Sequence, residues 1–229
     1  MKLSFIYFLL LFFLFSFSFG QNRFEIKNGS KIFDVEINVE NCFKENCEGN
    51  GVVKLINKVT KKIVQTFTSK NLYFYFDKNQ NPTVNIIQLY DEQSPLIFDD
   101  FNFDGTEDLA IRNGNNSSYG GPSYDVYVSN VSKTKFFLSD ELTKLASENL
   151  GMFETDSKRN RIITYSKSGC CWHKKSEYIV EPKKGLKLVC IFEEDATDGE
   201  VVKVTAKELI KNKWKTTIKK YKIDEYYKN

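Results

Sequence analysis

Residues 95–111 read PLIFDDFNFDGTEDLAI, and this stretch predicts a β-hairpin. The two ends, PLIF and DLAI, are short apolar runs typical of buried strands. Between them, Asp and Asn occupy alternate positions and Gly105 stands where the chain must bend. Two strands joined by a short polar loop favour antiparallel pairing.

The same pattern extends outward along the chain in both directions. Thirteen segments of alternating, β-branched or aromatic character are separated by turn residues. They are residues 31–40, 51–60, 62–69, 71–77, 82–91, 95–101, 108–114, 123–130, 161–167, 170–182, 186–194, 201–209 and 213–223. The sequence therefore predicts an all-β fold of successive antiparallel hairpins, which suits a sandwich, a barrel or a small propeller.

One segment departs from this pattern. Residues 139–151 contain leucines at near-helical spacing behind Ser139, a residue that commonly caps helix N-termini, and end at Gly151. We predict one short helix here. No linker is long enough to divide the rest of the chain, so residues 21–229 are predicted to form a single domain.

Residues 1–20 have the layout of a signal peptide: Lys2, a 15-residue apolar run from Phe5 to Phe19, and Gly20. The alternative is a membrane anchor, but the run is shorter than the ~18 residues that a spanning helix needs. We expect cleavage after Gly20 and a periplasmic or secreted protein without a stable membrane anchor.

The charge of the chain argues against nucleic acid as a partner. The formal net charge is only +3, and the basic residues are dispersed along the chain. Residues 211–223 are locally basic, but their lysines alternate with apolar residues. A solvated edge strand explains that pattern better, because lysine on an edge discourages unwanted pairing.

The five cysteines predict disulfides in an exported protein. Cys42 and Cys47 are close enough to close a small ring. Cys170, Cys171 and Cys190 leave one thiol over. We favour a bridge from Cys190 to Cys170 or Cys171, and a bridge between the two adjacent cysteines is the alternative.

The polar loop of the opening stretch has the ligand spacing of a calcium site. Side-chain oxygens of Asp100, Asn102, Asp104 and Asp108 fall at positions 1, 3, 5 and 9, and the Thr106 carbonyl falls at position 7. Calcium takes about six to eight oxygens, and a glycine at position 6 allows the sharp bend. An EF-hand would place a glutamate at position 12, where this chain has Ile111. The loop instead resembles the calcium-binding hairpins of FG-GAP β-propeller repeats. The alternative is an Asx-rich turn without an ion.

The loop that follows, residues 112–130, combines tyrosines with Gly, Ser and Asn, as binding loops do. Tyr119 and Tyr124 are the candidate partner contacts. A solvated turn whose tyrosines pack on the sheet is the alternative, and Tyr124 and Tyr127 should face opposite sides of a strand.

No residues in the sequence make a convincing catalytic site. Cys171 and His173 would share a face of a strand, but a thiol in this compartment tends to oxidise. A hydrolase would rest on acids such as Glu193, Glu194 and Asp195. We expect these acids to lie in a turn, so a solvated loop explains them better. We therefore expect a protein that is not an enzyme.

Three quoted features together indicate a family: DFNFDGTEDLAIRNGNN followed by YGGPSYDVY, the later SGCCWH, and the early cysteine-containing strand leading to KIVQTF. The chain resembles the calcium-binding periplasmic inhibitors that protect bacteria from lysozyme-like effectors of type IV secretion systems. The resemblance implies a small β-propeller of about five blades, calcium held by Asp100, Asn102, Asp104, Thr106 and Asp108, and a peptidoglycan hydrolase as partner. The alternative function is a carbohydrate-binding or adhesion module with a structural calcium site.

Overall fold

A computed structural model describes residues 22–130 and 132–228. The predicted signal peptide lies outside these residues. The described residues begin with a four-stranded antiparallel meander, in the order β1-β2-β3-β4. Its strands are β1 (Asn22–Ile26), β2 (Phe33–Cys42), β3 (Asn46–Asn57) and β4 (Ile63–Tyr75).

A second antiparallel sheet has the order β5-β6-β7-β8 and contains the predicted hairpin. Its strands are β5 (Leu96–Asp99), β6 (Asp108–Arg112), β7 (Tyr124–Ser129) and β8 (Phe136–Leu138). The 3-10 turn η1 (Ser118–Gly120) lies between β6 and β7, and helix α2 (Asp140–Glu148) follows β8. Leu109 of β6 pairs with Phe98 on one side and Tyr127 on the other.

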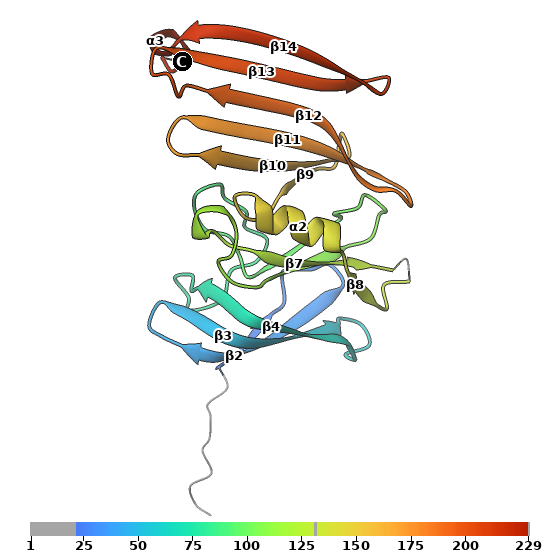
Figure 1. The fold of residues 1–229 in the computed structure, drawn as a ribbon. Helices are drawn as coiled ribbons and strands as arrows, with labels where there is room; N and C mark the ends of the chain where they lie inside the picture. The colour runs from blue at the N-terminus through green and yellow to red at the C-terminus, as the bar shows by residue number, and fades with distance from the viewer. Residues whose placement is uncertain (1–21, 131, 229) are drawn as a thin grey trace, which may run out of the picture.

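The third sheet is a six-stranded meander followed by the short helix α3 (Ile223–Tyr226). Its strands are β9 (Glu154–Asp156), β10 (Arg161–Ser168), β11 (Trp172–Glu181), β12 (Gly185–Asp195), β13 (Val201–Ile210) and β14 (Lys213–Lys222). Figure 1 shows this sheet at one end of the molecule, β2–β4 at the other, and β7 with α2 between them.

Strands β5 and β6 of the second sheet are buried on both faces, and this explains their apolar sequence. Leu96 and Phe98 contribute to a cluster with the first sheet, whereas Ile97 between them contributes to a cluster with α2 and β10. All five residues of β6 are buried. Because successive residues of a strand point to opposite faces, a run without polar alternation requires cover on both sides. Each fully buried large apolar side chain here contributes roughly 1.5–3 kcal/mol relative to exposure.

The all-β prediction of antiparallel hairpins is confirmed, but the described strands form three sheets and not about five blades. The difference arises mainly in β9–β14, where each strand pairs with the next and the meander continues as one sheet. Short turns between strands of 8–11 residues keep this pairing unbroken from β10 to β14.

Individual segments agree with the sequence prediction to different degrees. Residues 62–69 and 71–77 were predicted as separate segments but form the single strand β4. Residues 82–91 form only isolated bridges, because Asn85 and Tyr90 adopt positive φ angles of 60° and 65° that a strand does not allow. The short strands β1, β8 and β9 were not predicted.

The predicted helix is confirmed as α2. The Ser139 hydroxyl accepts a hydrogen bond from the Leu142 amide at 3.4 Å, and Leu142, Leu145 and Ala146 are buried. The capping hydroxyl satisfies an amide that would otherwise lack a partner in the first turn.

The disulfides confirm one prediction and correct another. Cys42 and Cys47 are bonded, as predicted. The predicted bridge from Cys190 is wrong, because Cys170 is bonded to Cys171 and Cys190 is free. Cys190 pairs with Glu177 in the sheet, whereas Trp172, next to Cys171, pairs with Asp195. Cys190 and Asp195 are five residues apart along β12, which places the Cys190 sulfur about 17 Å from the end of the sheet where Cys171 lies. This distance is too long for a disulfide bond.

Candidate functional site

The loop between β5 and β6, residues 100–107, is folded by hydrogen bonds from its own backbone to its acidic side chains. Asp100 accepts from the amides of Asp104 at 3.0 Å and Gly105 at 2.8 Å. Asn102 also accepts from the Asp104 amide, at 3.0 Å. Gly105 has a φ of +84°, and a Cβ atom built there would meet nothing within 4 Å. The bend therefore needs glycine for its backbone conformation and not for space.

Asp104 lies at the centre of this loop. Its carboxylate accepts from the Thr106 amide at 2.8 Å, from the Thr106 hydroxyl, and from the Asn102 side-chain amide at 3.0 Å. These contacts hold the predicted ligand positions 3, 5 and 7 together in one turn. Such Asx-type hydrogen bonds also occur in turns that hold no ion.

Asp108 is fully buried at the start of β6. Its two oxygens accept from the amides of Phe101 at 3.0 Å and Ser129 at 2.8 Å. Burial raises the pKa of Asp108 to about 7, the two amide hydrogen bonds oppose this, and the charges of Asp104 and Asp100 raise it further. Among the described residues, none of these three carboxylates forms a salt bridge.

The donor chemistry of this loop fits a hard cation, because it consists of carboxylate, amide and carbonyl oxygens. A buried carboxylate with two acidic neighbours and no cationic partner also favours positive charge nearby. In the described part of the chain, however, no three Asp, Glu, His or Cys side chains converge closely enough to hold a metal ion. Calcium binding by Asp100, Asn102, Asp104, Thr106 and Asp108 therefore stays a prediction.

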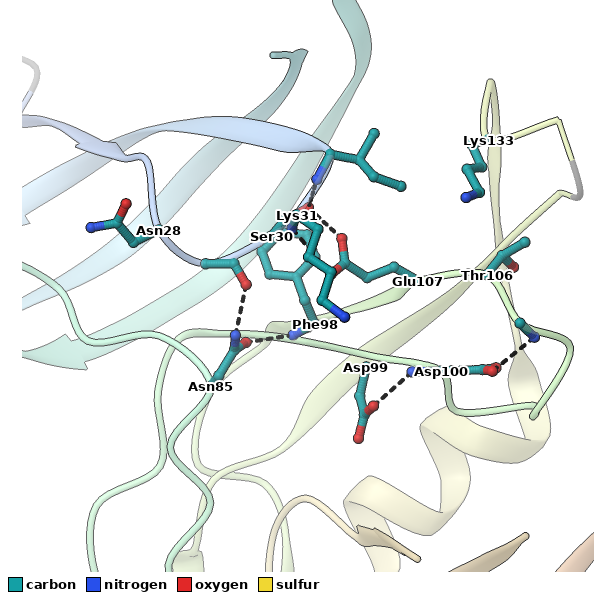
Figure 2. A pocket seen from close by; sticks show the side chains of 13 residues that line it. Asn28, Ser30, Lys31, Asn85, Phe98, Asp99, Asp100, Thr106, Glu107 and Lys133 are labelled. Atoms are coloured by element: carbon teal, nitrogen blue, oxygen red, sulfur yellow. Dashed lines mark hydrogen bonds between the residues drawn. The ribbon is translucent and has the colours of Figure 1, made fainter. Parts of the chain in front are cut away.

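A groove of about 600 Å³ lies beside this loop, between it and the β1–β2 connection. Figure 2 shows the Ser30 and Glu107 side chains meeting between the two loops, where the Ser30 hydroxyl donates to Glu107. Asn85 donates to the Gly29 carbonyl at 2.6 Å and accepts from the Phe98 amide at 2.7 Å. Glu107 thus attaches the loop to the β1–β2 connection, and Asn85 links that connection to β5. Sequence reasoning missed Ser30, Asn85 and Glu107, because their partners are distant in the chain.

The second region of interest contains the predicted partner residues, and the structure separates them. Tyr124 is fully buried, and its hydroxyl donates to the Ser94 carbonyl at 2.9 Å. The prediction that Tyr124 contacts a partner is therefore wrong. The sheet register explains this: Tyr124 faces the cluster around α2, while Tyr127 packs on Phe67 with ring centroids 4.7 Å apart. The expected opposite orientation of Tyr124 and Tyr127 is confirmed.

Tyr119 is 64% exposed and has a φ of +60°, which is uncommon for a residue other than glycine. Its hydroxyl accepts a hydrogen bond from the Gly169 amide at 2.7 Å. The Lys167 ammonium lies 4.8 Å from the centre of the Tyr119 ring and 4.6 Å from that of Tyr90. Tyr90 is 59% exposed, also with positive φ. We call Tyr90, Tyr119 and Lys167 the aromatic platform.

The platform borders a hollow of about 280 Å³ that also includes Gln93, Pro122 and Leu150. Strained backbone at two exposed aromatic residues around one hollow is the kind of feature that concentrates at functional sites. Sequence analysis did not identify Tyr90 as a site residue, because it lies near the end of a segment that was predicted to be a strand.

Of the rejected catalytic pair, Cys171 lies in the turn before β11 and His173 lies within β11. Cys171 is in a disulfide, and His173 pairs with Lys167 and Glu194 across the sheet. Glu194 accepts a hydrogen bond from the Tyr226 hydroxyl, and Asp195 accepts from the Thr197 amide at 3.1 Å. Glu193, Glu194 and Asp195 are the last residues of β12 and not a turn.

Comparison with known proteins gives one informative likeness. No family model matches the chain, and no curated protein matches it. A solved structure described as a Xanthomonas type IV secretion system related protein is similar, with a TM-score of 0.64 and 21% identity over 86% of this chain and 94% of that chain. At this identity the likeness shows a shared fold.

Proposed function

We propose that this protein is a periplasmic or secreted calcium-binding inhibitor that binds a peptidoglycan-cleaving enzyme of the lysozyme type and is not itself an enzyme. The observation that carries the proposal is the aromatic platform, in which Tyr119 is exposed yet held by a hydrogen bond at its hydroxyl. Exposed aromatic anchors dominate binding energy at protein interfaces, and a rigid one loses little entropy on binding. The fold shared with a type IV secretion system related protein supports this context.

The mechanism of inhibition would be steric. A substrate groove in a hydrolase is concave, and the platform would occupy it with Tyr119 and Tyr90 as the central contacts. No group of the inhibitor needs to react, so inhibition would be equimolar and without turnover. Among the described residues, no helix is long and apolar enough to cross a membrane.

Calcium in this proposal is structural. Asp100, Asn102, Asp104, Thr106 and Asp108 would hold the ion, and its charge would neutralise the acidic cluster around buried Asp108. Affinities of extracellular calcium modules are often on the order of 10⁻⁴–10⁻³ M. Millimolar calcium would then stabilise the fold by roughly 1–2 kcal/mol.

The proposal is tested by titrating lysozyme-type hydrolases with the purified protein and following peptidoglycan cleavage. We expect stoichiometric inhibition of a cognate enzyme, and a loss of at least about tenfold in affinity for Tyr119→Ala, as for interface anchors in general. Tyr227→Ala is a matched control, because Tyr227 is also exposed (56%) but lies beyond α3. If no hydrolase is bound at micromolar concentration, the proposal fails.

The second candidate is a carbohydrate-binding module, and the hollow beside Tyr90 and Tyr119 favours it. Aromatic rings next to polar side chains, here Asp91 and Gln93, are suited to stacking on sugars. Retention on purified peptidoglycan without any protein partner, lost in Tyr90→Ala, would support this function over inhibition.

A further inference from the structure

The hairpin of β13 and β14 concentrates positive charge. Residues 201–222 contain eight lysines and one acidic residue, Glu208, whereas the whole chain has a formal net charge of only +3. The rest of the chain is therefore net acidic. Figure 1 shows β14 as the outer edge of the third sheet, at the end of the molecule farthest from β2–β4.

The strand register sorts these lysines onto two faces. Lys203 pairs with Lys220, and Thr205 pairs with Ile218. Leu209 pairs with Trp214, so the face with Trp214 and Ile218 carries four lysines. We call this set the lysine face: Lys203, Lys207, Lys220 and Lys222 with Trp214 and Ile218. The opposite face holds Val202 and Val204, which pack against α3.

The lysine face is accessible along β14 and at Lys203, Lys207 is half-buried, and the face has exposed apolar groups. Every residue of β14 is exposed, with Trp214 at 45% and Ile218 at 55%. Lysine on an edge strand prevents pairing with other sheets, and this alone would explain the charge. It does not explain why a tryptophan and an isoleucine stand uncovered between the lysines.

Few acidic groups compensate these lysines. Of the four, only Lys222 forms a salt bridge within the described residues, to Glu225 at 3.9 Å between exposed side chains. Asp195 and Asp198 lie near one end of the lysine face. Hydrogen bonds within their own turn are the main cause that lowers the pKa values of these two aspartates, and the charges of Lys203 and Lys220 lower them further.

We propose that the lysine face binds the anionic surface of a phospholipid bilayer. Lysines attract a negatively charged lipid surface, and tryptophan and isoleucine insert between headgroups while the lysine stems keep their ammonium groups at the phosphates. A nucleic acid would match the charge, but its phosphates offer nothing for the exposed aliphatic Ile218. Such binding is peripheral and reversible by salt, and it is independent of the proposed inhibition.

The test is co-sedimentation of the full mature chain with vesicles of phosphatidylcholine containing about 30 mol% phosphatidylglycerol, against pure phosphatidylcholine. We expect binding only to the anionic vesicles, weakened strongly between about 0.05 and 0.5 M salt. The triple variant Lys203→Glu, Lys207→Glu, Lys220→Glu should lose at least about tenfold in affinity. Binding should shift tryptophan fluorescence to the blue in Trp172→Phe, in which Trp214 is the one remaining tryptophan.

The matched control is Lys44→Glu, Lys62→Glu, Lys78→Glu, which reverses three exposed charges outside the third sheet. Its affinity should stay within about twofold of wild type, since these lysines are far from the face. Equal loss in both triple variants would overturn the proposal, because net charge and not this face would then be responsible. Binding to double-stranded DNA without binding to vesicles would overturn it as well. Circular dichroism establishes that each variant is folded.

Discussion

Glu36 is a nearly buried charged residue of β2 whose partners are arranged around it by the first sheet. It accepts from Lys54 at 2.7 Å and from the Asn38 side-chain amide at 2.9 Å, and it forms a 2.8 Å salt bridge with Arg23. The Lys54 hydrogen bond is the largest influence lowering the pKa of Glu36, with contributions from Asn38 and Arg23, against burial. The ionised form is thus the one that the fold favours.

This predicts a pH dependence for the Glu36→Gln variant. Because the folded pKa is below the ordinary value of 4.5, the carboxylate stabilises the fold fully above that value and loses its contribution as the pH falls through the folded pKa. At pH 7 the variant should be less stable by about 1–3 kcal/mol. The difference should shrink below about pH 4 in urea unfolding followed over pH. A difference independent of pH would contradict this account.

At the scale of elements, the contact between the β1–β2 and β5–β6 connections joins the first two sheets. The Ser30 hydroxyl accepts from the amides of Ile32 at 3.0 Å and Phe33 at 2.9 Å while it donates to Glu107. Ser30 is 5% exposed, so its hydroxyl has little access to water. The hydrogen bonds therefore fix both connections at once.

We predict that Ser30→Ala and Glu107→Ala each lower the free energy of unfolding, by about 1–3 kcal/mol for buried Ser30 and less for Glu107. The double variant should lose less than the sum, because each single change already removes the shared hydrogen bond. A double-mutant cycle in urea measures this coupling. Strict additivity would show that the contact contributes nothing.

At the scale of the whole molecule, the β5–β6 hairpin lies at the centre of the fold. Its strands contribute to clusters on both faces, one shared with the first sheet and one shared with α2 and the third sheet. An ion bound in the loop of this hairpin would consequently stabilise all three sheets together. Addition of the ion should therefore shift the unfolding of the protein as a single transition.

The calcium proposal therefore predicts that wild-type protein melts at a higher temperature in millimolar calcium than in chelator, with a stabilisation of roughly 1–2 kcal/mol. Asp104→Ala should lose this difference. Asp224→Ala, which removes an exposed carboxylate in α3, should keep it. Wild-type melting that is insensitive to chelator, together with no heat of calcium binding by calorimetry, would reduce the loop to an Asx-rich turn.

Local features could be predicted from the amino-acid sequence: most strands and their hairpins, the capped helix α2, the ring closed by Cys42 and Cys47, and the loop with its glycine bend at Gly105. These depend on side-chain periodicity, turn chemistry and short loops, which neighbouring residues fix.

Contacts between distant segments could not be predicted from the sequence and follow from how the sheets pack. The tertiary structure grouped the strands into three sheets, left Cys190 unpaired, buried Tyr124, and brought Tyr90, Tyr119 and Lys167 together. Alternation of apolar and polar residues along a strand predicts which residues lie on each of its two faces. It does not predict which other segment packs against each face. The partner of each face is set by packing between segments that are remote in the chain.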